Sequence, residues 1–176
     1  MATQWKIDAM HSEVNFKVRH MMISNVSGNF KKFDGSAESE GDDFTTAKID
    51  FTVDTASINT NSEQRDGHLQ SPDFFDAAKY PQIKISGMGL QKVDDENYKL
   101  TADVTIKDIT NPVTFNVEFG GIDKDGYGQT KAGFTVTGKI NRQKFGLTWS
   151  AVTEAGSIIV SDDVNLNAEL QFVKQA

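Results

Sequence analysis

Apolar and polar residues alternate along most of this chain, as they do in strands that bury one face. In residues 12–20, Val14, Phe16 and Val18 share a face, and charged or amide side chains stand between them. Seven later stretches repeat this period of two, and their apolar or small positions are Val26, Gly28 and Phe30; Ile49, Phe51 and Val53; Ile83 and Ile85; Tyr98, Leu100, Ala102, Val104 and Ile106; Val113, Phe115, Val117 and Phe119; Ala132, Phe134, Val136, Gly138 and Ile140; and Val164, Leu166, Ala168, Leu170 and Phe172. The pattern predicts eight strands.

Short turns join most of these strands to the next, which favours antiparallel pairing between neighbours in sequence. The turn at residues 108–112 joins the clearest pair, and Asp125 and Gly126 lie in the next turn. We therefore predict an all-β fold, an eight-stranded antiparallel up-and-down barrel, with a β-sandwich as the main alternative. A chain of 176 residues fits one domain, which we take to span residues 1–176.

One segment, residues 60–80, interrupts the alternation. Thr60 followed by Glu63 has the spacing of a capping box, and Ser71 before Pro72 is a second helix-start signal. We expect two short helical turns here. They would place Leu69, Phe74 and Phe75 over one mouth of the barrel.

The sizes of the inward-facing side chains determine whether they fill the barrel interior or leave a cavity. Eight strands enclose room for packed side chains or for one small ligand. Several inward positions carry small residues, namely Gly28, Gly87, Ala102, Ala132, Gly138 and Ala168. Unfilled space at these positions would create a cavity, although glycine in a strand also marks bulges and bends.

Composition limits the classes of function. The net charge of −7 argues against nucleic acid or an anionic membrane surface as a partner. The chain has no cysteine, which excludes disulfides, thiolate metal sites and cysteine nucleophiles. No secretory signal and no apolar run long enough to cross a bilayer is visible, so we expect a cytoplasmic protein, or a periplasmic one if a leader has been removed.

Few polar residues stand out as candidates for chemistry. His20, His68 and Arg142 could bind a ligand oxygen at the barrel mouth, or could instead tie loops to backbone carbonyls and nearby carboxylates. The spacing of His11, His20 and His68 matches no compact metal motif, and Asp123, Asp125 and Gly126 fit a hairpin turn better than a calcium loop. No nucleophile elbow is present. We therefore expect no metal site and no catalytic residues.

Several multi-residue motifs resemble the YceI family over essentially the whole chain. They are Trp5 to Asp8 with His11-Ser12, Phe16 to Met21, Gly28 to Phe30, Arg65 to Leu69, Phe74 to Asp76, Tyr80-Pro81 and Ile140 to Leu147. The resemblance implies a lipocalin-like barrel whose tunnel holds a polyisoprenoid or another long amphiphile, such as an isoprenoid quinone or a fatty acid derivative. It also implies a homodimer and no cofactor other than the bound lipid.

On this basis we assign two groups of candidate residues. The tunnel would be lined by Val14, Phe16, Val18, Phe30, Phe51, Phe74, Phe75, Val104, Phe115, Val117, Phe134, Val136, Leu166 and Leu170. The lipid head group at the mouth would meet His20, Arg65, His68, Arg142 and Trp149. Two alternatives stay open: an enzyme such as a hydrolase that acts on a lipid head group with His20 or His68 as base, and a packed structural protein without a tunnel.

Overall fold

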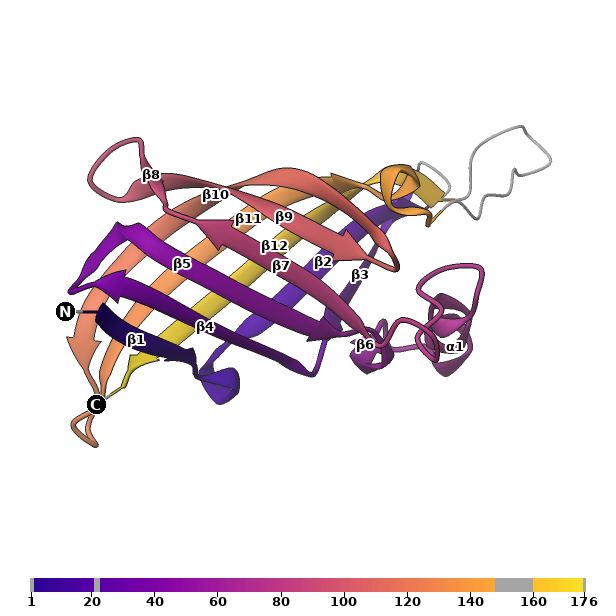
Figure 1. Ribbon diagram of the computed structural model, residues 1–176. Helices are drawn as coiled ribbons and strands as arrows, with labels where there is room; N and C mark the ends of the chain where they lie inside the picture. The colour runs from indigo at the N-terminus through magenta and orange to yellow at the C-terminus, as the bar shows by residue number, and fades with distance from the viewer. Residues whose placement is uncertain (1, 21–22, 148–159, 176) are drawn as a thin grey trace.

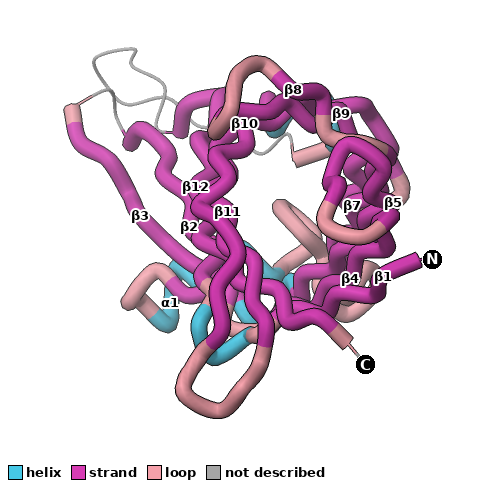
Figure 2. The backbone as a smooth tube through the Cα atoms, turned by 90° about the vertical axis from the view of Figure 1, so that its left-hand side faces the viewer, coloured by secondary structure: helices cyan, strands magenta, loops and turns pink. Residues whose placement is uncertain are grey.

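The strands close into one antiparallel barrel (Figures 1 and 2). The computed structural model describes residues 2–20, 23–147 and 160–175, with only the main chain described at His20 and Val160. The ring runs β1-β4-β5-β7-β9-β10-β11-β12, and β12 pairs back to β1 with Trp5 opposite Lys174. Eight strands in this order, each antiparallel to its neighbours, form the predicted up-and-down barrel.

The strands differ mainly in length and in whether they bend. Their bounds are β1 Ala2–Ile7, β2 Glu13–His20, β3 Ser24–Phe30, β4 Phe33–Glu40, β5 Asp43–Asp54, β6 Ile58–Asn59, β7 Gln82–Met88, β8 Gln91–Lys92, β9 Asn97–Ile106, β10 Ile109–Lys124, β11 Thr130–Asn141 and β12 Val160–Lys174. The helix α1 spans Glu63–Gln70, and 3-10 turns span Ala9–His11, Thr55–Ser57 and Arg142–Phe145.

Three pairs of consecutive strands are separated only by a bend, so that each pair acts as one long, bent strand. The 3-10 turn Ala9–His11 separates β1 from β2, yet both pair with β12, so together they act as one strand. In the same way β3 continues into β4, and β5 into β6 through Thr55–Ser57. β2, β3 and β6 thus extend the sheet beyond the closed ring toward α1 (Figure 1).

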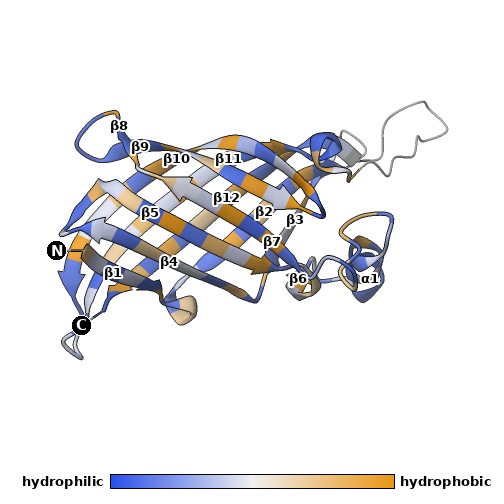
Figure 3. Ribbon diagram, in the orientation of Figure 1, coloured by the Kyte–Doolittle hydropathy of each residue, from blue (hydrophilic) through white to orange (hydrophobic). Residues whose placement is uncertain are grey.

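Hydrophilic and hydrophobic residues alternate along the strands (Figure 3), and the residues that are buried are mostly apolar. In β9, for example, Leu100, Ala102, Val104 and Ile106 are buried. These residues belong to a continuous apolar core that draws on nearly every strand of the ring.

The segment between β6 and β7 contains one helix and a series of turns, rather than two helical turns. Ser62 caps α1 by accepting a hydrogen bond from the backbone N–H of Arg65, at 3.3 Å. Thr60 is therefore not the cap. Its hydroxyl and N–H both donate to Asp66 Oδ1, at 2.5 and 2.8 Å, which fixes the entry to the helix. The residues after Ser71 form turns without a second helix.

Two of the small inward positions that we expected to leave space are filled by phenylalanine rings. Phe16 lies over Gly28, which stands opposite it on β3. Phe115 lies over Gly138 in the same way, and Leu100 over Gly87. Glycine here admits a large neighbour, so the free volume of the barrel is smaller than the sequence suggested.

Candidate ligand cavity

A cavity of about 140 Å³ lies inside the barrel. Its wall is almost entirely apolar, and eighteen of its twenty lining residues are Val, Ala, Phe, Ile or Leu. They are Val14, Ala37, Phe44, Ala47, Ile49, Phe51, Val53, Ile85, Leu90, Leu100, Phe115, Val117, Phe134, Val136, Leu166, Ala168, Leu170 and Phe172, together with Asn15 and Asn167. Such a wall offers dispersion contacts and hydrocarbon burial but few hydrogen bonds.

Some of the residues predicted to line a tunnel border the cavity, and the others do not. Eight of the fourteen border the cavity: Val14, Phe51, Phe115, Val117, Phe134, Val136, Leu166 and Leu170. The other six do not line it: Phe16, Val18, Phe30, Phe74, Phe75 and Val104. Val104 is fully buried, and it shows that correct inward parity is not enough to reach the cavity.

An aromatic cluster stands at the end of the cavity nearer the two termini. Phe44 contacts Trp5 and Phe134, with ring centroids 5.2 and 5.0 Å apart, and Phe134 stacks on Phe119 at 5.3 Å. Trp5 donates a hydrogen bond from Nε1 to the buried Ser39 Oγ, at 2.9 Å, so its polar edge is satisfied. We call Trp5, Phe44, Phe119 and Phe134 the terminus-end cluster.

A second row of rings joins the barrel to the α1 segment. Phe30 lies 5.5 Å from Phe16 and 6.0 Å from Phe75, measured between ring centroids. Phe74, which is buried, packs instead against His68 at 5.1 Å. We call Phe16, Phe30 and Phe75 the helix-end cluster. These rings attach residues 60–80 to the barrel, which explains why they do not line the cavity.

Alternation alone missed several cavity residues, above all Phe44. The parity of β5 changes within the strand, because Phe44 and Ala47 are both buried although they lie three positions apart, an odd number. The pairing of β4 with β5 shifts register between Glu38 and Glu40, which marks the irregularity. A strict period of two from Ile49 backward therefore assigns Phe44 to the wrong face. Its aromatic character was the one available signal.

The residues predicted to meet a head group are not brought together. Arg65 donates to Thr60, from Nε to Oγ1 at 2.8 Å and from Nη2 to the carbonyl oxygen at 2.6 Å. His68 pairs with Asp73 through Nε2, at 2.9 Å, and both side chains are partly exposed. Neither side chain lines the cavity. The side chain of His20 and all of Trp149 lie outside the described residues.

Arg142 is buried, and its guanidinium group donates hydrogen bonds to backbone carbonyl oxygens. Its Nη1 donates to the carbonyl oxygen of Leu147 at 2.6 Å, and its Nε to that of Ser161 at 2.9 Å. Burial lowers the pKa of Arg142, an effect that Asp162 at 3.8 Å opposes. Arg142 thus holds a loop in place rather than facing a ligand: it joins the end of β11 to the start of β12 and does not border the cavity.

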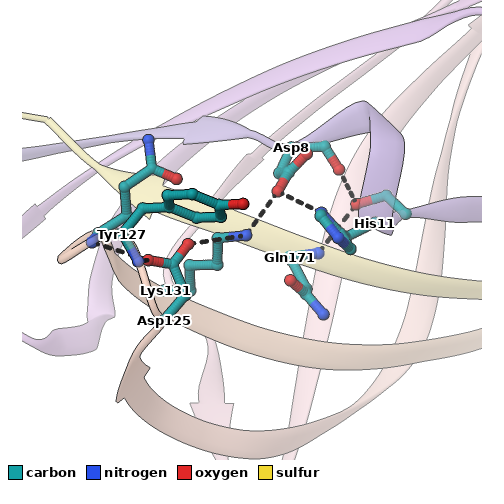
Figure 4. A network of polar contacts seen from close by, with 8 residues as sticks. Asp8, His11, Asp125, Tyr127, Lys131 and Gln171 are labelled. Carbon is teal, nitrogen blue, oxygen red and sulfur yellow. Dashed lines mark hydrogen bonds and ion pairs between the residues drawn. The ribbon is translucent and has the colours of Figure 1, made fainter.

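A polar network on the outside fastens the bend between β1 and β2 (Figure 4). Lys131 Nζ lies 2.8 Å from Asp8 Oδ2 and 3.4 Å from Asp125 Oδ2. His11 Nδ1 lies 2.8 Å from the same oxygen of Asp8. The hydrogen bond from Lys131 holds the pKa of Asp8 below its ordinary value, and Asp8 in turn raises the pKa of Lys131. The network clamps the bend onto β11.

Nowhere in residues 2–20, 23–147 and 160–175 do three or more His, Asp or Glu side chains gather as potential metal ligands. Within the same residues, no helix has the length and hydropathy required to span a bilayer.

The model of the YceI-like domain family matches residues 5–172. The chain belongs to the YceI-like family. UPF0312 proteins of Staphylococcus aureus strains USA300 and N315 are each 39% identical to it over 171 residues, which cover 97% of this chain and 97% of theirs.

Solved structures share the barrel. A YceI protein of Campylobacter jejuni is 36% identical, with a TM-score of 0.76 and 90% of each chain covered. BcnA of Burkholderia cenocepacia is 23% identical, with a TM-score of 0.79 over 94% of this chain and 98% of its own. A polyisoprenoid-binding domain from Saccharophagus degradans is 15% identical, with a TM-score of 0.71 over 97% and 98% of the two chains. The last two show the fold alone.

Proposed function

We propose that this YceI-like protein binds a long amphiphilic lipid, namely a polyisoprenoid, an isoprenoid quinone or a fatty acid derivative, for storage, transport or sequestration. The observation that carries the proposal is the cavity wall, in which eighteen of twenty residues are apolar. Burial of a hydrocarbon chain is favourable by about 0.8 kcal/mol per methylene group. The fold shared with a polyisoprenoid-binding domain adds support.

The size of the cavity constrains how such a lipid enters. A cavity of about 140 Å³ is comparable to one of about 150 Å³ that holds a benzene molecule. A lipid with a long hydrocarbon chain therefore fits only if some cavity-lining side chains change rotamer and enlarge the cavity. The rings of Phe51 and Phe115 are suitable, because both line the cavity and each folds over a glycine on a neighbouring strand, Gly35 and Gly138.

The placement of His68 bears on the alternative of catalysis by that residue. A general base must lie within hydrogen-bond reach of the group that it deprotonates. His68 is 41% exposed, bonds to Asp73 and stands on α1 outside the cavity wall. Catalysis by His68 on a lipid held in the cavity thus has no support from this geometry.

Native mass spectrometry of protein purified from its own host tests the proposal. We expect a bound lipid of isoprenoid or acyl type, released by organic extraction. Ala168→Trp fills the cavity wall and should abolish the adduct, whereas Thr101→Trp on the exposed outer face of β9 should keep it. If Ala168→Trp fails to fold, Ala168→Leu gives a smaller addition. Wild-type protein without any lipid, or equal lipid in the two tryptophan variants, would contradict the proposal.

A further inference from the structure

A second hollow, of about 950 Å³, lies over β2 and its neighbours β12 and β3, which stand side by side in Figure 2. Its volume falls within the about 300–1,000 Å³ typical of small-molecule sites. Eleven of its fifteen lining residues are polar or charged, in contrast to the apolar cavity inside the barrel. More than half of the eleven are asparagines, namely Asn15, Asn29, Asn59, Asn61, Asn165 and Asn167. We call this space the amide hollow, and its lining calls for a polar ligand.

The strand register orders the residues of the amide hollow from acidic to basic. The opposite residues in three successive pairs of β12 and β2 are Glu169–Glu13, Asn167–Asn15 and Asn165–Lys17. Residues two positions apart in a strand share a face and are separated by about 7 Å, so about 14 Å separates the acidic pair from Lys17. The amides lie between these two charged ends.

Glu13 and Glu169 form the acidic end, where two exposed carboxylates stand directly opposite each other. Like charges in this position destabilise a sheet. The side-chain hydrogen bonds that they accept come from neutral donors, Asn15 Nδ2 at 3.3 Å and Thr135 Oγ1 at 2.7 Å. Neither glutamate belongs to an ion pair within residues 2–20, 23–147 and 160–175. A bound ammonium group would neutralise this pair of carboxylates.

Lys17 forms the basic end. Its neighbours across the strands are neutral, Asn165 on β12 and Ser27 on β3. Lys17 is exposed and makes no ion pair within the part of the chain that the structure describes. Its ammonium group carries three donors and attracts a carboxylate. The two ends together match a ligand with an ammonium group at one end and a carboxylate at the other.

The amides between the charged ends determine what the body of the ligand must offer. An asparagine amide carries both donors and acceptors, and so does each peptide unit of a polypeptide backbone. The side chains of Asn165 and Asn167 bond to no other residue in the described ranges, so their amides are available to a ligand. A hydrocarbon would leave these amides unpaired, and a phosphate would be repelled by the two glutamates.

We propose that the amide hollow binds a short peptide with both ends free, extended along β2 in the direction from Glu13 to Lys17. The amino group lies between Glu13 and Glu169, the carboxylate lies at Lys17, and the peptide units between them pair with Asn15 and Asn167. An extended chain rises about 3.4 Å per residue, so about four residues span the distance between the two charged ends. The site recognises the ends and the backbone of the peptide, and it does not depend on what the apolar cavity holds.

Tetra-alanine tests the proposal, because it carries only a backbone and two charged ends. In NMR titrations wild-type protein should bind it saturably, with shifts confined to β2, β12 and the asparagine side chains of the amide hollow. N-acetyl-tetra-alanine lacks the ammonium group and tetra-alanine amide lacks the carboxylate. Each should bind about tenfold more weakly, as expected for one lost charge-assisted contact. Absence of saturable binding, or equal affinity for all three peptides, would overturn the proposal.

Two sets of variants assign each end of the peptide to its partner. Glu13→Gln with Glu169→Gln should lower the affinity for tetra-alanine about tenfold and leave that for N-acetyl-tetra-alanine unchanged, because the acetylated peptide has no ammonium group. Lys17→Met should likewise weaken the binding of tetra-alanine and leave that of tetra-alanine amide unchanged. Variants that weaken all three peptides equally would contradict this orientation of the ligand.

Controls of equal charge separate this site from the overall charge of the protein. Glu38→Gln with Glu40→Gln, and Lys48→Met, remove the same charges from exposed positions of β4 and β5 and should leave the affinity for tetra-alanine unchanged. Thermal denaturation checks that every variant folds. Spermidine, a cation without a carboxylate, and maltotetraose, a neutral sugar, represent two other classes of polar ligand. If either binds as tightly as tetra-alanine, the hollow is a cation site or a sugar site and the proposal is wrong.

Discussion

The ring of Phe115 lies directly over Gly138 on the neighbouring strand. A Cβ atom at position 138 would stand 2.7 Å from Cδ1 of that ring, closer than real side chains approach. Gly138→Ala should therefore push the ring toward the cavity that Phe115 lines, and should lower the free energy of unfolding by about 1–3 kcal/mol. Denaturant unfolding measures the change, and lipid retention should fall with it.

Gly133 on the same strand gives a matched control. No atom beyond its chain neighbours lies within 4 Å of a Cβ built there, so Gly133→Ala should leave stability and lipid retention nearly unchanged. Equal effects of the two substitutions would show that loss of glycine flexibility, rather than contact with Phe115, is responsible.

Arg142→Met should lower the free energy of unfolding. It leaves the buried carbonyl oxygen of Leu147 without its Nη1 donor and the partly buried one of Ser161 without its Nε donor, and an unpaired buried group costs about 1–3 kcal/mol. Lys144→Met, on the same 3-10 turn but exposed, should have little effect. If lipid retention falls in Arg142→Met while unfolding is unchanged, the residue acts on the ligand and not on the fold.

The pairing of Asp8 with Lys131 should make stability depend on pH at both extremes. The pKa of Asp8 is lowered in the folded state, so its contribution is present above its ordinary value of 3.8 and disappears as the pH falls through the folded-state pKa. The pKa of Lys131 is raised, so its contribution is present below 10.5 and is lost as the pH rises through the folded-state value.

Thermal melts of wild type and Asp8→Asn across pH measure this dependence. The melting temperature of Asp8→Asn should be lower than that of wild type near neutral pH, and the two should converge in strong acid. A gap of constant size down to the lowest pH at which both fold would mean that the carboxylate charge contributes nothing.

Phe75→Ala should loosen residues 60–80 from the barrel. Phe75 is half-buried and makes its ring contact with Phe30, so the loss should be smaller than the about 3–5 kcal/mol typical of a fully buried Phe. Hydrogen exchange should accelerate in α1 more than in β9 or β10. Lys79→Ala, on the same segment, serves as the control. Exchange that rises equally throughout the barrel would argue against a local role for Phe75.

The sequence predicted the barrel because alternation is a property of each strand alone. Leu100 and Val104, for instance, have the same parity in the sequence and in the structure. The contacts that the sequence did not predict are those between strands, because they depend on which strands are neighbours and in what register. The overlap of Phe115 with Gly138 is set by the register between β10 and β11, and the contact of Lys131 with Asp8 joins residues far apart in the chain.

The candidate site was predicted less completely for the same reason. Phe16 and Phe30 face inward as expected, yet their distance along the barrel from the cavity follows from the bends that extend β2 and β3 toward α1. Arg142 and Arg65 are predicted to meet a lipid head group, but both donate hydrogen bonds to nearby residues of the chain instead. A side chain's type does not reveal which acceptor lies nearest.

The pairing of β1 with β12 has a consequence for biosynthesis. Trp5 finds its partner Lys174 only after nearly the whole chain has been made, and β2 likewise waits for β12. Until then the sheet has two open edges, and its apolar inner face stays accessible to water and to other nascent chains. A ribosome that pauses before β12 would therefore carry an open sheet with unpaired edges and an exposed apolar face. A delay in the synthesis of the last strand should thus favour aggregation more than a delay at any other strand.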